Sequence, residues 1–224
     1  STFTLGQFGG HGGRALRAGD VLHLAPLAET GEGAALPAGL RTALTDVRTL
    51  RVIYGPHGAP EFFAPAYMAT FFATDWEVHF NSSRTGVRLI GPKPVWTRDS
   101  GGEAGLHPSN IHDNPYAVGA VDFTGDMPVI LGPDGPSLGG FVCPVTVIEA
   151  DLWQLGQLKA GDKVRFVAVD VPTARRLAAG RRAGLATLQA QDVAWQPVPL
   201  TSPVVMTCGD ADKRLVARLS GDTH

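Results

Sequence analysis

The sequence has few cysteines and no long apolar run. Its 224 residues include only two cysteines, Cys143 and Cys208, which form no close-spaced pair and lie in or just after apolar runs. They are typical of small buried residues in a reducing compartment, and they exclude a disulfide framework. No apolar stretch approaches the length of a membrane span, and no basic segment followed by an apolar one opens the chain. We therefore expect a cytoplasmic protein with no membrane partner.

The sequence also lacks an excess of charge of either sign. It has 19 Lys and Arg against 21 Asp and Glu, a net charge of −2. Nucleic acid and anionic lipid attract proteins through clustered Lys and Arg. The one basic cluster, within Arg175–Arg182, lies among Ala and Gly and is typical of a solvated helix face. We expect no nucleic acid partner.

Glycine and proline, in contrast, are abundant. Their 28 and 17 residues separate short apolar runs, a pattern typical of short strands joined by tight turns. The sequence therefore predicts a mainly β fold with a few short helices. The expected strands are Val21–Leu24, Thr49–Tyr54, Glu77–Phe80, Val87–Ile90, Ala117–Asp122, Pro128–Leu131, Val142–Ile148, Lys163–Ala168 and Val204–Cys208. The expected helices are Pro65–Thr74, Glu149–Leu155 and Pro172–Gly184.

Two segments resemble each other. Leu16–Leu24 and Leu158–Phe166 share the order Leu, base, Ala, Gly, Asp, followed by an alternating run. The Gly can adopt positive φ in a turn, and the Asp can bind backbone amides as the chain enters a strand. The repeat suggests two similar β units, and we expect sub-units at residues 1–60 and 61–224.

The two ends of the sequence suggest a piece of a longer polypeptide. The chain opens on Ser1 without an initiator Met, and it stops at Leu219–His224 without a composed terminus. We expect residues 1–224 to be one part of a larger multidomain chain. An active site can then be shared with parts outside this sequence.

The densest polar cluster is Gly101–Tyr116, which Gly and Pro predict to be an irregular loop. Such loops often carry functional groups. A metal site is one interpretation, because His107, His112 and Asp113 are suitable ligand types, although spacings of five and one match no helix face. A hydrogen-bonded Asx-turn loop is the second. The third is a small-molecule site in which Asn110 and Asp113 bind a planar amide or amidine.

Two further segments carry candidate binding groups. Gly139 and Gly140 lie between two expected strands, where they form either a plain hairpin loop or an oxyanion-binding nest of backbone N–H groups. Arg84 follows two serines in Asn81–Gly86. Its guanidinium can bind a carboxylate through two hydrogen bonds or form a surface salt bridge.

These clusters belong to motifs that resemble a known family. Asn81–Leu89, together with Gly55–Pro56 and Glu61–Phe63, is similar to the second-subunit family of 5-oxoprolinase and allophanate-hydrolase-like proteins. That family shares its fold with the carboxyltransferase domain of urea carboxylase (urea amidolyase). Gly102–Asp113 and Asp134–Pro144 resemble urea carboxylase and its guanidine-using relatives more than the 5-oxoprolinase branch. The resemblance runs from Thr2 to about Val169.

The resemblance implies a fold, cofactors and partners. It implies cyclophilin-like β-barrel subdomains, placed in one polypeptide with biotin carboxylase and biotin carrier domains and with the adjoining half of the carboxyltransferase domain. Biotin, as carboxybiotin, would be carried on another domain, and ATP and Mg would be used by another domain. The expected activity is transfer of the carboxyl group from carboxybiotin to urea, which gives allophanate.

The resemblance also assigns roles on the acceptor side. We expect Asn110 and Asp113 to bind the acceptor, and His112 to orient Asp113 or relay a proton. An amide nitrogen is a weak nucleophile, so holding it next to the carboxyl group accelerates attack by orientation alone. Biotin itself can accept the proton, so a dedicated base is not required.

On the biotin side, loss of the carboxyl group leaves negative charge on the ureido oxygen, which needs hydrogen-bond donors. Backbone N–H groups around Gly139 and Gly140, together with Ser137, are the expected donors, and Arg84 is expected near the carboxylate.

Three alternatives remain open at this point. Guanidine can replace urea as the acceptor, and it is a cation that favours an extra carboxylate. The chain can be a 5-oxoprolinase subunit, which acts on a cyclic amide without biotin. It can also be a noncatalytic module that binds and regulates a partner protein.

Overall fold

The computed structural model describes residues 2, 6–23, 34–35, 42, 44–187, 191–192, 204–207 and 214–217. Contacts divide the chain into one unit of residues 40–189 and a second unit of residues 1–39 and 190–224. The sequence suggested a division between residues 60 and 61. The contacts give a different boundary because residues 47–54 form a strand that pairs with two other strands of the first unit.

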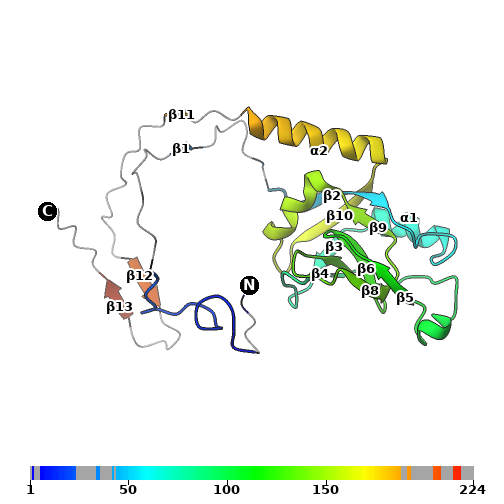
Figure 1. Ribbon diagram of the computed structural model, residues 1–224, viewed down its shortest axis with the longest axis horizontal. Helices are drawn as coiled ribbons and strands as arrows, with labels where there is room; N and C mark the ends of the chain where they lie inside the picture. The colour runs from blue at the N-terminus through cyan, green and yellow to red at the C-terminus, as the bar shows by residue number, and fades with distance from the viewer. Residues whose placement is uncertain are drawn as a thin grey trace. The chain divides into compact units, whose positions relative to one another are not determined.

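The first unit is a closed β-barrel of seven strands (Figure 1). Around the barrel the order is β10-β2-β9-β6-β7-β4-β3. The pair β10–β2 is parallel and the other barrel pairs are antiparallel. The bounds are β2 (Val47–Tyr54), β3 (Trp76–Val78), β4 (Gly86–Ile90), β6 (Ala120–Thr124), β7 (Met127–Leu131), β9 (Val145–Val147) and β10 (Lys163–Ala168). The predicted mainly β fold with a barrel is confirmed.

The helical segments described beside the barrel are α1 (Pro65–Ala73), η2 (Gly102–Ala104), η3 (Glu149–Gln157) and α2 (Val171–Ala186). Proline stands in the first turn of α1, where its missing N–H costs no hydrogen bond. The side chain of Asp170 caps α2 by accepting the Thr173 N–H at 2.8 Å. The three helices that the sequence predicted therefore exist, and η3 is a 3₁₀ helix.

The barrel interior is apolar and aromatic. Alternation along the strands places the inward side chains in this core, as in β6, where Val121 and Phe123 are fully buried. Phe71 of α1 stacks on Phe166 of β10 with ring centroids 4.9 Å apart, so the helix packs directly onto the barrel core. The Nε1 of Trp76 donates to the Phe71 carbonyl at 2.9 Å, which satisfies the one polar group of that buried ring.

A two-stranded antiparallel sheet lies beside β6 and contains β5 (Asn110–Pro115) and β8 (Leu138–Phe141) (Figure 1). Both segments were predicted to be loops, and that prediction was wrong. The segments pair with each other across the chain, and tertiary pairing overrides the local preference of Gly, Pro and Asn for turns.

A second, smaller apolar cluster belongs to this region. It contains Ala120, Val129, Leu131 and Cys143, and Tyr116 packs against it. Val129 and Asp122 are partners in the β6–β7 pairing, and both are buried. Because side chains alternate along a strand, this cluster lies on the face of β6 and β7 opposite the barrel interior.

The second unit contains two strand pairs within its described residues. β1 (Ala34–Ala35) pairs with β11 (Gln191–Asp192), and β12 (Val204–Thr207) pairs with β13 (Arg214–Ala217). The strand predicted at Val204–Cys208 corresponds to β12, and Cys208 lies outside the described residues. Residues 21–23 of the strand predicted at Val21–Leu24 have no regular structure, and Leu24 lies outside the described residues.

Candidate functional site

The three segments that the sequence singled out lie together. β5 carries Asn110 and pairs with β8, which carries Gly139 and Gly140. The loop at Asn81–Thr85 is tied to the start of the β7–β8 connection. Gly132 N–H donates to the Thr85 carbonyl at 3.0 Å, and Asp134 N–H donates to the Arg84 carbonyl at 3.2 Å. The structure therefore joins these segments into one region.

Arg84 and Asp134 form an ion pair across this region. The Arg84 Nε lies 2.8 Å from Asp134 Oδ2, and Nη2 lies 3.1 Å from Oδ1. This parallel geometry is the two-point contact that a guanidinium makes with any carboxylate. Arg84 is thus held by a carboxylate of the chain itself, at a largely exposed position.

A bulge interrupts the pairing of β5 with β8. Asn110 pairs with Phe141 and Asn114 pairs with Gly139, so four steps along β5 match two along β8. The residues between, including His112 and Asp113, stand opposite Gly140 alone. A Cβ on Gly140 would lie 2.9 Å from the Ile111 carbonyl oxygen, so a glycine allows the bulge to pass close by.

His112 and Asp113 are exposed on this bulge. Bulges occur near active sites because they redirect side chains that regular pairing would alternate. Neither side chain has a hydrogen-bond partner within the described part of the chain. The bulge therefore presents an imidazole and a carboxyl group outward.

Asn110 lies at the start of β5, half-buried. Its backbone N–H donates to the His107 carbonyl at 2.9 Å, and its carbonyl accepts from Arg98 Nη2 at 2.5 Å. Its side chain packs against Gly105, where a Cβ would collide with the amide nitrogen. The amide has no hydrogen bond to another described residue, so its donor and acceptor are available to a ligand.

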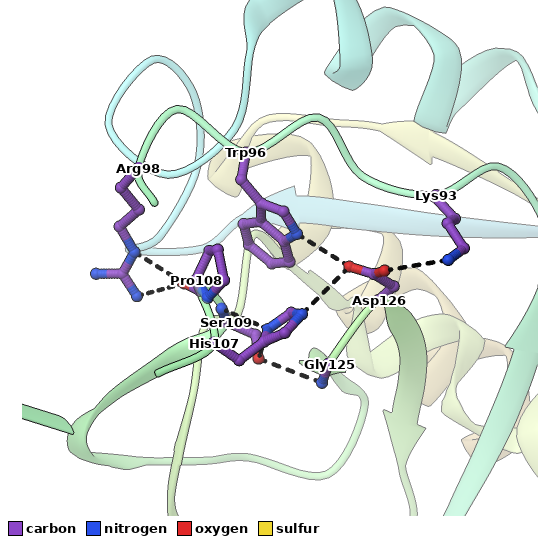
Figure 2. Close-up of polar contacts among 8 residues, drawn as sticks. All are labelled: Lys93, Trp96, Arg98, His107, Pro108, Ser109, Gly125 and Asp126. Atoms are coloured by element: carbon purple, nitrogen blue, oxygen red, sulfur yellow. Dashed lines mark hydrogen bonds and ion pairs between the residues drawn. The ribbon is translucent and has the colours of Figure 1, made fainter. Parts of the chain in front are cut away.

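A polar network holds the segment just before β5 (Figure 2). The Asp126 carboxylate accepts from Trp96 Nε1 at 3.1 Å, and it lies 3.4 Å from His107 Nε2 and 3.6 Å from Lys93 Nζ. These contacts join the β6–β7 turn to two segments that come earlier in the chain. They fix the position from which β5 starts.

Within this network, Ser109, His107 and Asp126 stand in a row (Figure 2). His107 Nδ1 accepts from the Ser109 N–H at 3.1 Å and lies 2.9 Å from Ser109 Oγ, which accepts the Gly125 N–H at 3.2 Å. The order resembles a nucleophile, base and acid. Ser109 is 0% exposed, however, so its hydroxyl meets no substrate, and the row positions β5.

Gly139 and Gly140 lie in an extended strand, and neither has a left-handed φ. They therefore do not form the N–H nest that the sequence suggested, because a nest needs a left-handed residue. Gly139 instead makes room for Tyr116, whose ring would lie 2.6 Å from a Cβ at that position. The Tyr116 hydroxyl accepts the Phe141 N–H and donates to the Phe141 carbonyl, both at 2.7 Å. Tyr116 thus attaches β8 to the barrel.

Two cavities adjoin the region, and Ser83 lines both. The larger, about 600 Å³, is lined by Arg84 and by apolar residues of η3. The smaller, about 400 Å³, is lined by Gly139 of β8, by Tyr116 and by residues of β4, β6 and β7. The predicted site residues that line neither of these two cavities are Asn110, His112, Asp113, Ser137 and Gly140.

The sequence analysis missed Asp122, which lines the smaller cavity. It lies in β6 and is only 4% exposed, and its Oδ1 has no hydrogen-bond partner. Burial raises the pKa of this carboxyl group to about 7, although the nearby charge of Arg88 acts in the opposite direction. The signal available in the sequence was an acidic residue within an apolar run, because burying a charge there costs free energy.

The described residues contain neither an activated thiol nor a cluster of metal ligands. Cys143 is a buried free thiol, and burial raises its pKa to about 11, which disfavours the nucleophilic thiolate. Within the described residues, no three His, Cys, Asp or Glu side chains gather as metal ligands. No described helix combines the length and apolar character needed to span a bilayer.

Comparison with known proteins places these observations in a family. Residues 1–168 match the model of the carboxyltransferase domain, subdomains A and B. The urea amidolyase of Lachancea kluyveri is 51% identical over 199 residues, 84% of this chain and 11% of that protein. The urea amidolyase of Saccharomyces cerevisiae is 51% identical over 183 residues. A 5-oxoprolinase subunit of Escherichia coli is 28% identical over 160 residues, 71% of this chain and 47% of that protein.

A solved structure agrees with these relatives. The urea carboxylase of Kluyveromyces lactis has a TM-score of 0.72 and 43% identity, over 88% of this chain and 18% of that one. The chain spans about a tenth of the length of its urea amidolyase relatives. The expected resemblance is confirmed, and the chain belongs to the carboxyltransferase domain family, in the region of its subdomains A and B.

Proposed function

We propose that this chain is the carboxyltransferase portion of a cytoplasmic, biotin-dependent urea carboxylase, which transfers the carboxyl group of carboxybiotin to urea and forms allophanate. The observation that carries the proposal is the pairing of β5 with β8, which joins the expected acceptor residues to the expected biotin residues in one sheet. The 51% identity to urea amidolyases, against 28% to a 5-oxoprolinase subunit, supports urea carboxylase over the other branch.

On the acceptor side, the β5 bulge provides the reacting groups. The Asn110 amide can donate to the urea oxygen and accept from an N–H group, and the exposed carboxylate of Asp113 can accept a second N–H. His112 is adjacent and exposed, so its imidazole can exchange a proton with solvent or with the acceptor. Two fixed contacts to a planar molecule orient its nitrogen for attack.

On the biotin side, the larger cavity fits the chemistry of the cofactor. Its walls include Leu152, Trp153 and Leu158, which suit an apolar ring system, and Arg84 lies at the same cavity. Arg84 can bind a carboxylate through the two-point contact that it now makes with Asp134. Biotin would supply a transferable carboxyl group on its ureido nitrogen. Ser137, Gly139 and Gly140 lie outside this cavity, in and just before β8, and we propose that they donate hydrogen bonds to a ureido oxygen that extends from the cavity toward β8.

The remaining functions belong to other parts of the same polypeptide. We propose that a biotin carboxylase domain uses ATP and Mg, that a carrier domain delivers biotin, and that the adjoining half of the carboxyltransferase domain completes the site. The short span of this chain relative to its urea amidolyase relatives, about a tenth of their length, supports this arrangement. The exposure of His112 and Asp113 also leaves these side chains open to an approaching domain.

Substitutions in the full-length polypeptide test the proposal. Asn110→Ala and Asp113→Ala should each lower urea-dependent allophanate formation by about 10²–10³-fold, the usual loss when one positioned polar group is removed. Bicarbonate-dependent ATP cleavage, which reports biotin carboxylation, should keep its wild-type rate. Asp99→Ala removes an exposed carboxylate at another place and serves as the control. Unchanged allophanate formation in both variants would contradict the proposal.

A further inference from the structure

The ladder between β5 and β8 is short and interrupted. The bulge separates the pair at Asn110 from the pair at Asn114, and among the described strands β5 pairs with β8 alone. A two-stranded ribbon is only marginally stable in water unless other parts of the chain support it. The spacing between the proposed acceptor residues and the proposed biotin residues therefore depends on contacts outside the ladder.

Arg98 covers the edge of β5 that faces away from β8. Carbonyl groups along a strand point alternately to its two edges. The Ser109 carbonyl accepts the Val142 N–H at 2.9 Å, on the side of β8. The Pro108 carbonyl accepts from Arg98 Nε at 2.8 Å and from Nη2 at 2.5 Å (Figure 2). The Asn110 carbonyl accepts from the same Nη2 at 2.5 Å. Arg98 thus donates where a third strand would donate.

Local pairing places Arg98 at this edge. Phe63 and Trp96 form an antiparallel bridge, and the Thr97 N–H donates to the Phe62 carbonyl at 3.1 Å. The next residue, Arg98, therefore lies beside Phe62, and its guanidinium carbon is 4.6 Å from the centroid of that ring. A guanidinium can stack on an aromatic ring while its N–H groups donate in the plane. The ring therefore fixes the orientation of these donors.

His57 makes the corresponding contact at the end of β8. Its Nδ1 accepts the Cys143 N–H at 3.0 Å, two residues beyond the strand. The Gly55 N–H donates to the Pro144 carbonyl at 2.7 Å, and a Cβ on Gly55 would collide with the Cys143 carbonyl oxygen. Burial lowers the pKa of His57, so the imidazole is neutral at pH 7 and Nδ1 is available as an acceptor.

Phe62 connects these two contacts. Its ring is 7% exposed and meets the His57 ring edge-on, with centroids 5.0 Å apart and planes at 80°. Arg98 lies over the same ring. We call Arg98, Phe62 and His57 the Arg98 stack. None of its residues lines either cavity beside the site, so the stack reaches β5 and β8 through the backbone.

We propose that Arg98 and His57 are positioning residues, which set the spacing of β5 and β8 through the Arg98 stack. Arg98 holds the strand of the proposed acceptor residues, and His57 holds the end of the strand of the proposed biotin residues. The inference rests on the proposed function for the reaction that this spacing serves. A displacement of about 1 Å between reacting groups can lower a rate by about 10²-fold.

The first test is Arg98→Met in the full-length polypeptide, which keeps a long side chain over Phe62 and removes the donors. The KM for urea should rise by about 10-fold, because Asn110 loses its fixed position. Arg98→Lys keeps a charged donor and should recover part of this loss. Bicarbonate-dependent ATP cleavage should be unchanged. The control is Arg165→Met, which removes a guanidinium bound to Asp75 and should leave the KM within about twofold of wild type.

The second test compares two substitutions of His57. His57→Asn keeps an acceptor oxygen close to the position of Nδ1, whereas His57→Leu leaves the Cys143 N–H without a partner. The leucine variant should lower kcat by about 10-fold with little change in the KM for urea, because β8 carries the biotin side. The asparagine variant should keep kcat within about threefold of wild type. Equal kcat values in the two folded variants would contradict the role of His57.

The two residues should also depend on each other. The loss in kcat/KM of the Arg98→Met, His57→Leu double variant should be smaller than the product of the single losses, because both act through one stack. Independent, multiplicative losses would contradict a shared stack.

Amide hydrogen exchange in the full-length protein tests the positioning without turnover. Exchange within residues 107–116 and 138–143 should become faster in Arg98→Met and in His57→Leu and stay at the wild-type rate in Arg165→Met. Wild-type exchange rates in both of the first two variants overturn the inference. Faster exchange in these variants, together with a wild-type enzyme that forms no allophanate, would overturn the proposed function and leave the positioning role in place.

Discussion

The two faces of strand β6 differ in composition and in what surrounds them. On the inner face, Val121 and Phe123 are fully buried in the barrel core. On the outer face, Asp122 is just as deeply placed but lines a cavity and keeps an oxygen without a partner. One strand therefore packs apolar side chains into the core with one face and holds a buried carboxyl group at a cavity with the other, because successive side chains point to opposite sides.

The largest effect should come from the inner face. Phe123→Ala removes a ring that packs 5.0 Å from the centroid of Phe63 and leaves a cavity in the core. The free energy of unfolding should fall by about 3–5 kcal/mol, measured by denaturant unfolding of the chain. Phe80, 82% exposed, is the matched control, and Phe80→Ala should change stability by less than about 0.5 kcal/mol. Equal losses in the two variants would remove the distinction between the faces.

On the outer face, Asp122→Asn should change how stability depends on pH. The folded pKa of Asp122, about 7, lies above the ordinary value of an unfolded Asp. The folded state therefore holds a proton that the unfolded state releases. The stability contributed by this proton is complete below pH about 4 and is lost as the pH rises through 7.

The variant lacks this titration, so its stability relative to wild type should rise between pH 4 and pH 8. The rise should be on the order of 2–4 kcal/mol. Thermal unfolding of both proteins across this pH range measures it. A stability difference that stays constant with pH would show that Asp122 is not buried as a proton-holding acid.

The smallest effect concerns the strand that covers the outer face. Gly139→Ala places a Cβ 2.6 Å from the Tyr116 ring, which two hydrogen bonds to Phe141 hold in place. The displacement should cost about 1–3 kcal/mol, measured by denaturant unfolding. Gly180→Ala in α2 meets no atom within 4 Å and should stabilise the chain by about 0.5–1 kcal/mol. A stable Gly139→Ala protein would show that Tyr116 can move away from β8.

Some local structure followed directly from residue types. The two Leu-base-Ala-Gly-Asp segments form the same turn, with φ of +93° at Gly19 and +86° at Gly161. Asp20 accepts the Arg17 N–H at 2.7 Å, and Asp162 accepts the Lys159 N–H at 3.1 Å. Only the second turn leads into a regular strand within the described residues, β10, which has partners on both sides. A turn needs only its own residues, whereas a strand needs neighbours.

The site was predicted less completely than the fold. The motifs containing Asn110, Asp113 and Gly139 identified segments that the structure brings together, because polar residues and glycines gather there. Their conformation was predicted wrongly, since glycine-rich and proline-rich segments look like loops until a partner strand is known. Asp122 was missed because the expected strand ended at that residue, whereas β6 continues to Thr124 and encloses the acid.

The family, the mainly β class, the helix starts at proline and the Gly-Asp turns could all be predicted from the chain alone, because each depends on motifs of residues close together in the chain. Only the tertiary structure decided that four steps of β5 match two of β8, which places His112 and Asp113 on a bulge. It also decided that Arg88 and Asp122 share a cavity, since they lie on strands separated by β7. Closure of the barrel sets which strands are neighbours, and no local residue pattern encodes contacts between residues so far apart in the chain.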